Sequence, residues 1–193
     1  MNRLSLFIAA ILITFASPIF AAIYNIGPGD DFGNLGLVDY DEFYMTGGQG
    51  HNLDLLDWST GTIENTSPII GEGVGGIWEI ETKSFSELTI SGGEINDLFG
   101  YDESEISLSG GQILGDLTIY NDTAWVHIFG YGFNNDPFPG SPLTGFWADD
   151  TPFSINLVDS AISTYDQIVF HIIPEPATLL LLGLGGLAFR KRR

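Results

Sequence analysis

The chain has 193 residues, enough for one domain of ordinary size, and it contains no cysteine, which excludes disulfide bonds and cysteine-based zinc sites. Of its 25 acidic side chains, 24 lie between residues 22 and 173, where Lys83 is the single basic side chain, so this segment has a formal charge of −23 (24 negative, one positive). Such a charge repels nucleic-acid phosphates and attracts divalent cations, so we expect no nucleic-acid partner.

Residues 1–22 are predicted to be a signal peptide with a signal helix. A short positively charged start precedes a twelve-residue apolar run, residues 4–15. The small residues Ala21 and Ala22 mark the region of signal cleavage. An uncleaved membrane anchor is the alternative, although the apolar run is short for a span. In either case residues 23–173 form an exported, acidic body.

The body is predicted to be all-β, because it contains no long amphipathic helical pattern. Its apolar residues alternate with polar ones or form short runs, and Gly, Asp, Asn and Ser separate these runs. This pattern is typical of short strands joined by tight turns. The clearest such segments are residues 75–82, 88–93, 117–133 and 153–159.

A repeat of 18–19 residues runs through the middle of the body, where "ISGGEINDLFGYDESEISL" (90–108) aligns with "LSGGQILGDLTIYNDTAWVHI" (108–128). The aligned pairs include Gly92 with Gly110 at a step of 18, and Leu98 with Leu117 and Ile106 with Trp125 at a step of 19. A fainter copy covers residues 45–63. This period predicts a short parallel β-solenoid over residues 23–133, in which segment 64–87 is irregular. A β-sandwich with two similar hairpins is the alternative.

After the repeat, the chain is predicted to end its body with a β cap, residues 141–173. The segment 134–145 is rich in proline and glycine and indicates a loop. A hairpin is expected in residues 143–159, with its turn near Asp149, and a last strand in residues 165–173.

No motif in the body predicts catalysis, so we expect a protein that is not an enzyme. The segment "GEGVGG" (71–76) matches G-x-G-x-x-G, but a strand pattern follows it where a nucleotide-binding unit needs a helix. His51, His127 and His171 lie far apart in the sequence and have no metal-binding spacing. A β-helix glycoside hydrolase, which needs only a pair of carboxylates, remains as a third functional hypothesis.

Weak calcium binding is the one cofactor hypothesis that the body supports. The candidate ligands are Asp30, Asp31, Asp39 and Asp41, which lie in carboxylate-rich turns and offer the hard oxygen atoms that Ca²⁺ prefers. The calcium-binding nonapeptide G-G-x-G-x-D-x-U-x fails in "GGQGHN", because Asn52 replaces the aspartate. Solvated acidic turns are the alternative.

The last 20 residues, "PEPATLLLLGLGGLAFRKRR", differ from the rest of the chain. Pro174, Glu175 and Pro176 precede an uncharged run, residues 177–189, which as a helix would cover about 20 Å of a hydrocarbon core about 30 Å thick. A basic cluster then ends the chain at Arg190, Lys191, Arg192 and Arg193. The positive-inside rule would leave this cluster in the cytoplasm and the body outside, with a short transmembrane helix between them.

This ending resembles the PEP-CTERM sorting tail of bacterial exported proteins, because its three parts occur in the expected order. The resemblance implies transient retention in the inner membrane and recognition of Pro174–Pro176 by an exosortase, which processes the tail. Proteins with this tail are associated with the cell envelope or the exopolysaccharide matrix. The body also resembles, more loosely, repeat-rich relatives of planctomycete type, and that second resemblance implies no activity.

Together these features predict an exported, non-enzymatic protein of the cell envelope or exopolysaccharide matrix, located at the inner membrane and then at the cell surface. The alternative is a module for carbohydrate binding or calcium-dependent adhesion, with polysaccharide as its partner. Exposed aromatic rings could bind sugars by stacking; the candidates are Trp58, Trp78, Tyr101, Tyr120, Trp125 and Trp147.

Overall fold

The computed structural model describes residues 21–71, 73–134 and 141–175, and this part of the chain is all-β, as the sequence predicts. It contains thirteen strands and one short 3₁₀ helix, η1 (Tyr165–Gln167), and no α-helix. The strands are β1 (Ile23–Ile26), β2 (Asn34–Leu37), β3 (Glu42–Met45), β4 (Gly50–Leu55), β5 (Thr60–Ile63), β6 (Ile77–Thr82), β7 (Glu87–Gly100), β8 (Glu105–Ile113), β9 (Asp116–Ile119), β10 (Trp125–Gly130), β11 (Leu143–Phe146), β12 (Pro152–Asp159) and β13 (Ile168–Ile172).

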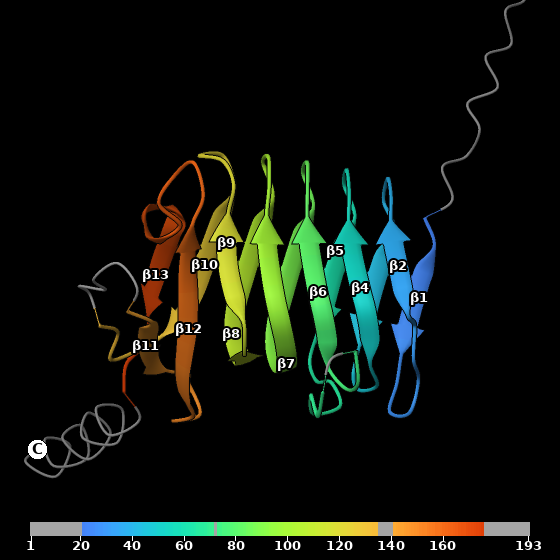
Figure 1. Ribbon diagram of the computed structural model, residues 1–193, viewed down its shortest axis with the longest axis horizontal. Helices are drawn as coiled ribbons and strands as arrows, with labels where there is room; N and C mark the ends of the chain where they lie inside the picture. The colour runs from blue at the N-terminus through green and yellow to red at the C-terminus, as the bar shows by residue number, and fades with distance from the viewer. Residues whose placement is uncertain (1–20, 72, 135–140, 176–193) are drawn as a thin grey trace, which may run out of the picture.

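The strands form two rows in which neighbours pair in parallel. One row has the order β1-β3-β5-β7-β8-β10-β13, and the other has the order β2-β4-β6-β7-β9-β12. Figure 1 shows one row in front of the other, and the long strand β7 belongs to both. Among the named strands, only β11 and β12 pair antiparallel. This pairing differs from the hairpins of the β-sandwich alternative.

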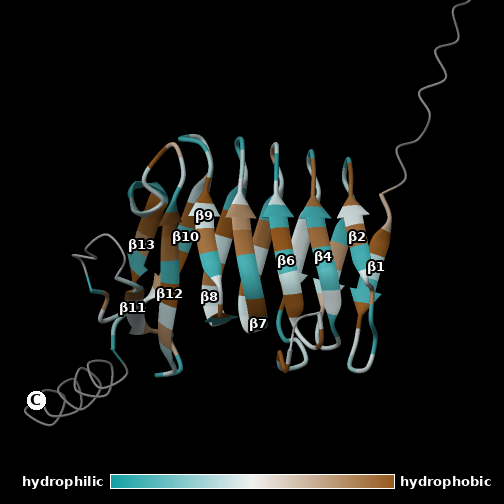
Figure 2. Ribbon diagram, in the orientation of Figure 1, coloured by the Kyte–Doolittle hydropathy of each residue, from teal (hydrophilic) through white to brown (hydrophobic). Residues whose placement is uncertain are grey.

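The core lies between the two rows because side chains of a strand alternate between its two faces. In the first row, the inward column includes Ile63, Ile90 and Leu108, which lie opposite one another in the ladder and are at most 1% exposed. In the second row, Leu98 and Leu117 form a similar column with no exposed surface. Figure 2 shows the resulting alternation of hydrophobic and hydrophilic positions along the strands.

The two edges of the rows differ. At the turn edge, the upper edge in Figure 1, a tight turn follows each of the strands β2, β4, β6, β7 and β9. Four of these turns each contain one residue with a positive φ: Asp39, Asp57, Ser84 and Asp102. At the glycine edge, the lower one, glycine pairs bend the chain, and Gly48, Gly93 and Gly111 have φ between 82° and 89°. The chain enters the body at the turn edge, where β1 starts, and leaves it at the glycine edge, after β13.

The register confirms one predicted alignment and corrects two others. Gly110 lies opposite Ser91 and not Gly92, because the ladder between β7 and β8 is irregular at this point. Leu98 lies opposite Leu117, as the repeat predicts. Ile106, however, lies opposite Val126 and not Trp125. A shift of one residue moves a side chain to the other face of a strand, so Val126 is buried and Trp125 is 39% exposed. The reason is one further inserted residue in the turn before β10.

The C-terminal part of the body also differs from the predicted cap. β11 and β12 form the expected antiparallel pair, but β12 also pairs in parallel with β9, and β13 pairs in parallel with β10. These two strands therefore continue the rows. The predicted signal helix and transmembrane helix lie in residues 1–20 and 176–193, outside the described ranges. Within those ranges, no helix has the length and apolarity needed to cross a membrane.

Candidate functional site

The strand β13 leads directly into the proline-flanked segment at the C-terminus. Its end is held at the glycine edge by a hydrogen bond from the Ile173 N–H to the Gly130 carbonyl oxygen, 2.9 Å long. Pro174 and Glu175 follow at once, and both are exposed and outside any strand or helix. Because proline restricts the backbone of its own residue and the one before it, an extended conformation is favoured here. The segment is therefore accessible and only one residue from the folded body.

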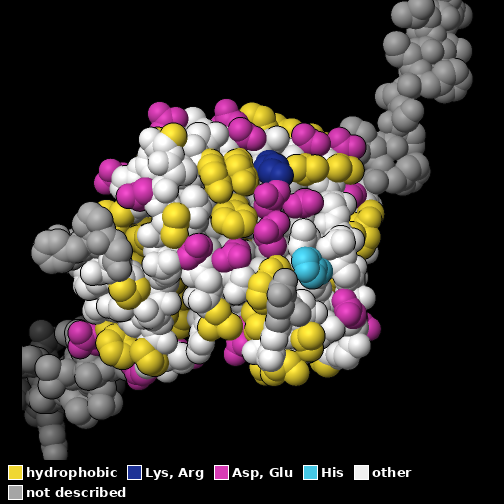
Figure 3. Space-filling model, viewed as in Figure 1, with side chains coloured by type: hydrophobic (Ala, Val, Ile, Leu, Met, Phe, Trp, Pro, Cys, Tyr) yellow, Lys and Arg dark blue, Asp and Glu magenta, His cyan; other side chains and the backbone are white. Residues whose placement is uncertain are grey.

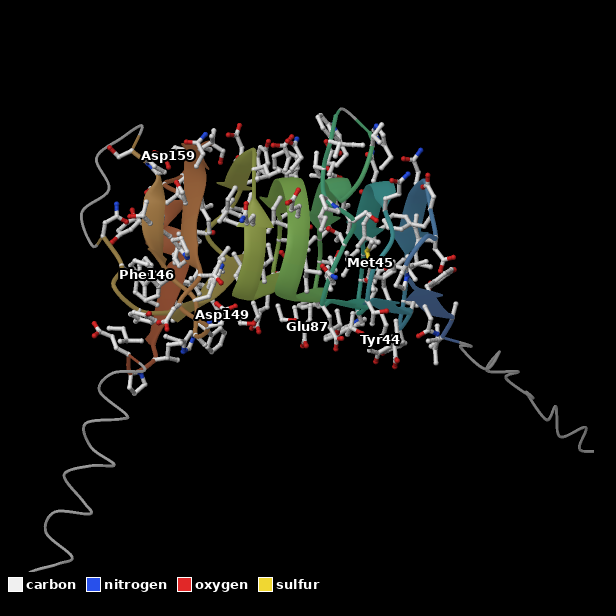
Figure 4. The ribbon with its side chains drawn as sticks, turned by 90° about the horizontal axis from the view of Figure 1, so that it is seen from below. Tyr44, Met45, Glu87, Phe146, Asp149 and Asp159 are labelled. Carbon is white, nitrogen blue, oxygen red and sulfur yellow. The ribbon has the colours of Figure 1, made fainter. Side chains whose placement is uncertain are left out.

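Apolar and acidic side chains surround this exit. Ile172 is 77% exposed, and the ring of Tyr131 stacks on Phe146, with centroids 5.5 Å apart. The Tyr131 hydroxyl donates a hydrogen bond to Asp150, and this bond is the main reason that the pKa of Tyr131 is raised to about 12. Figure 4 shows Phe146 and Asp149 near the last strands, at this end of the body.

The comparison with family models decides what this ending is, because the model described as the PEP-CTERM protein-sorting motif matches residues 173–193. The chain carries a PEP-CTERM sorting motif. This confirms the resemblance found in the sequence and supports an exported protein that an exosortase sorts. The resemblance to planctomycete relatives stays a prediction. Comparisons of the chain with curated proteins and with solved structures give no match.

The PEP-CTERM motif is described in the structure only at its start. Pro176 and the basic cluster Arg190–Arg193 lie outside the described residues, so their roles stay predictions. At the other end of the chain, Ala21 is exposed, whereas Ala22 is already part of the fold: its carbonyl oxygen accepts a hydrogen bond from the Glu42 N–H at 2.8 Å. The predicted region of signal cleavage therefore lies at the first residue of the body.

Acidic side chains concentrate on the outer face of the second row (Figure 3). Glu79 lies opposite Asp97 in the ladder, and Asp54 lies opposite Glu81. Burial raises the pKa of Asp54 and of Glu79, and the neighbouring carboxylates raise each pKa further. Lys83 pairs with Glu81, which is the one ion pair among the described residues. The excess of negative charge on this face attracts cations and repels anions, because its one positive charge is already paired.

The four calcium candidates are used locally, to build turns. Asp30 accepts a hydrogen bond from the Gly27 N–H. Asp31 accepts hydrogen bonds from the Gln49 side chain and from the Gly33 N–H, which lower the pKa of Asp31. Asp39 is the positive-φ residue of its turn, and Asp41 accepts backbone N–H bonds. In the described ranges, no three His, Asp or Glu side chains come together as a metal site. Calcium binding therefore gains no support from this geometry.

The candidate aromatic residues do not form a flat platform for sugars. Trp58 stacks on Phe85 with centroids 4.4 Å apart and planes 10° apart, and Tyr101 stacks on Tyr120 at 4.4 Å and 3°. In each pair, one face of each ring is covered by the other ring, so that this face is not available for stacking on a sugar. Trp147 is only 3% exposed, and Trp78 and Trp125 lie in different rows. Sugar stacking on a coplanar row is therefore not supported.

A groove with a volume of about 490 Å³ lies at the glycine edge. Its floor is formed by the glycine pairs 92–93 and 110–111, and its walls by segments 65–68 and 147–151. Two carboxylates line it. One oxygen of Glu94 accepts a hydrogen bond from the Ile69 N–H at 2.7 Å, and Asp149 accepts one from the Thr151 N–H. Hydrogen bonding from the Thr151 side chain, and then from its N–H, lowers the pKa of Asp149.

The structure brings together two histidines that the sequence analysis kept apart. The His127 Nδ1 and His171 Nε2 atoms are 2.9 Å apart and share a hydrogen bond, and the ring of Phe129 stacks on His171 at 4.3 Å. The parallel pairing of β10 with β13 places them on one face, although 44 residues separate them in the sequence. The signal for this pair in the sequence was that both histidines lie in apolar segments with a strand pattern. The pair helps to hold the strand that precedes the sorting motif.

Proposed function

We propose that the protein is an exported, non-enzymatic component of the cell envelope or exopolysaccharide matrix. In this proposal its C-terminal tail holds it in the inner membrane until an exosortase processes the segment Pro174–Pro176. The observation that carries the proposal is the match of residues 173–193 to the PEP-CTERM model. The exposed position of Pro174 and Glu175, directly after β13, supports their role as a protease substrate.

The experiment is fractionation of the native host with and without its exosortase. We expect the mature protein to lose its tail and leave the inner membrane only when exosortase is present. Replacement of Pro174 and Pro176 by alanine should keep the tail attached, whereas the control Pro142→Ala, outside the motif, should not. A protein that keeps its tail and stays in the inner membrane in every strain would refute the proposal.

We further infer that the body is a short parallel β-solenoid. Both rows advance by 18–20 residues for most successive neighbours, as in the pairs Leu88 with Ile106 and Ile106 with Val126. In such a fold each repeat contacts mainly its neighbours, so one repeat can be removed if the register is kept. Deletion of residues 87–104 places Glu105 where Glu87 was. We expect a folded all-β protein of lower melting temperature, whereas loss of all cooperative unfolding would contradict the solenoid.

The groove at the glycine edge favours one second candidate function, the binding of a neutral carbohydrate. Its lining combines hydroxyl groups, two amides and two carboxylates, which suit sugar hydroxyls, and the carboxylates disfavour acidic sugars. Calorimetric titration with neutral and acidic oligosaccharides tests this. We expect binding of neutral sugars alone, and its loss in Gln112→Ala; no binding of either kind would eliminate this candidate.

A further inference from the structure

One buried charge in the body has no side-chain cation beside it. Asp41 is 8% exposed, and its two carboxylate oxygens accept hydrogen bonds from the N–H groups of Ala22 (2.7 Å) and Val38 (3.3 Å). Lys83, the only basic side chain between residues 22 and 173, pairs with Glu81. A buried carboxylate is costly unless it is both hydrogen-bonded and paired with a positive charge.

The charge is also unusual for its place in the fold. Asp41 belongs to a column of buried residues at the turn edge, in which the carbonyl of each member accepts a hydrogen bond from the next repeat. The links run from Thr60 N–H to Asp41, Glu87 N–H to Ser59, Glu105 N–H to Ser86 and Trp125 N–H to Ser104, at 2.9–3.1 Å. Ser59, Ser86 and Ser104 have no exposed surface and carry no charge. The aspartate therefore needs an explanation that concerns the first repeat alone.

Ala22 is the residue that begins this column. Its carbonyl oxygen accepts the Glu42 N–H at 2.8 Å, which is the same link that joins the later members. Its nitrogen atom lies 2.7 Å from Asp41 Oδ1. The repeat structure thus starts at Ala22, and the atom that would become a new N-terminus there already contacts the buried carboxylate.

We propose that signal peptidase hydrolyses the Ala21–Ala22 bond and that the new α-ammonium group of Ala22 forms an ion pair with Asp41. Water adds across the amide, so that Ala21 gains a carboxylate and Ala22 an amino group. With an ordinary pKa of about 7.7–8.0, that group is largely protonated at neutral pH. Processing during export then completes the fold, because it supplies a positive charge beside Asp41, where no basic side chain of the body provides one. This inference rests on the proposed function only in assuming that the protein is exported.

The geometry favours hydrolysis of the Ala21–Ala22 bond over hydrolysis of the Ala22–Ile23 bond. Cleavage after Ala22 would make Ile23 the first residue and would remove both the nitrogen that contacts Asp41 and the carbonyl that accepts the Glu42 N–H. The carboxylate would then be buried beside one remaining N–H, that of Val38. Cleavage further upstream would leave an amide at Ala22, which donates a hydrogen bond but carries no charge.

The first test is N-terminal sequencing of the protein exported by its native host, which should begin at Ala22. A protein that is exported but begins at another residue would overturn the inference and leave the proposed function intact. A protein that is not exported at all would instead contradict the proposed function.

The second test does not depend on export. It uses the chain Ala22–Arg193 in detergent, with its α-amino group free or acetylated, and each form with Asp41 or with Asp41→Asn. We expect acetylation to lower the melting temperature by about 5 °C when Asp41 is present and to have little effect in Asp41→Asn. The control Glu42→Gln, at the adjacent residue, should leave the effect of acetylation unchanged. An equal effect of acetylation with and without Asp41, or none, would overturn the ion pair.

Discussion

The turn edge and the glycine edge connect the same strands, yet they differ in how much the length of their connections varies. At the turn edge, the turns between the rows keep similar lengths from the first repeat to β10 and stack on one another through backbone hydrogen bonds. At the glycine edge, the connections from β5 to β6 and from β10 to β12 are longer, and the second of them contains β11. The groove and the exit of the tail lie at this edge. One edge therefore maintains the repeat, whereas the other carries the features on which function would depend.

The largest expected effect is at the glycine edge. A Cβ atom at Gly110 would lie 2.1 Å from the Ser91 carbonyl oxygen, so Gly110→Ala must displace the backbone. We expect a loss of about 3 kcal/mol in the free energy of unfolding, measured by denaturant titration. Gly36→Ala is the control, because a Cβ there meets no atom within 4 Å. Equal stability of the two variants would show that close packing does not define this edge.

Trp147→Phe tests how the insertion before β12 is anchored to the glycine edge. The indole N–H of this buried residue donates a hydrogen bond to the Gly111 carbonyl oxygen at 2.9 Å. Loss of the bond and of part of the ring should cost about 2 kcal/mol in the same measurement. Trp125→Phe, at a 39% exposed position, should cost much less. The reverse order would mean that the insertion contributes little to stability.

At the turn edge we expect a smaller effect, decided by backbone conformation. Asp57 has a φ of 56°, a left-handed conformation that aspartate tolerates better than alanine. Asp57→Ala should lower the free energy of unfolding by about 1 kcal/mol, and Asp57→Gly should leave it unchanged or raise it. A glycine variant as unstable as the alanine variant would indicate that the carboxylate, and not the backbone, matters at this edge.

The smallest effect is a local one at the tail exit. The hydrogen bond to Asp150 is the main reason that the pKa of Tyr131 is raised to about 12, because the neutral phenol donates to the carboxylate and ionisation would place two negative charges together. In Asp150→Asn this pKa should fall towards its ordinary value of about 10. Ultraviolet titration checks this, with Tyr131→Phe identifying the signal. An unchanged titration would show that the insertion does not hold Tyr131 in place.

Part of the candidate site could be predicted from the sequence, because its signal is local. The order Pro174, Glu175, Pro176, then an apolar run and a basic cluster, is read without knowing any contact, and the family comparison matches the same residues. The His127–His171 pair could not be predicted in this way, because it depends on which strand lies beside β10. The groove likewise needs segments 65–68 and 147–151, which only the stacking of the rows brings together.

The sequence by itself determined the all-β character of the body, the step that places Leu98 opposite Leu117, and the sorting motif, since alternation, glycine pairs and proline act over a few residues. Only the tertiary structure decided that Val126, and not Trp125, lies opposite Ile106. It also decided that β12 and β13 continue the rows and that Ala22 contacts Asp41. The physical reason is that register depends on the exact length of each turn. Polar turns of four and five residues look alike in a sequence, but one extra residue moves each side chain of the next strand to the other face of the sheet.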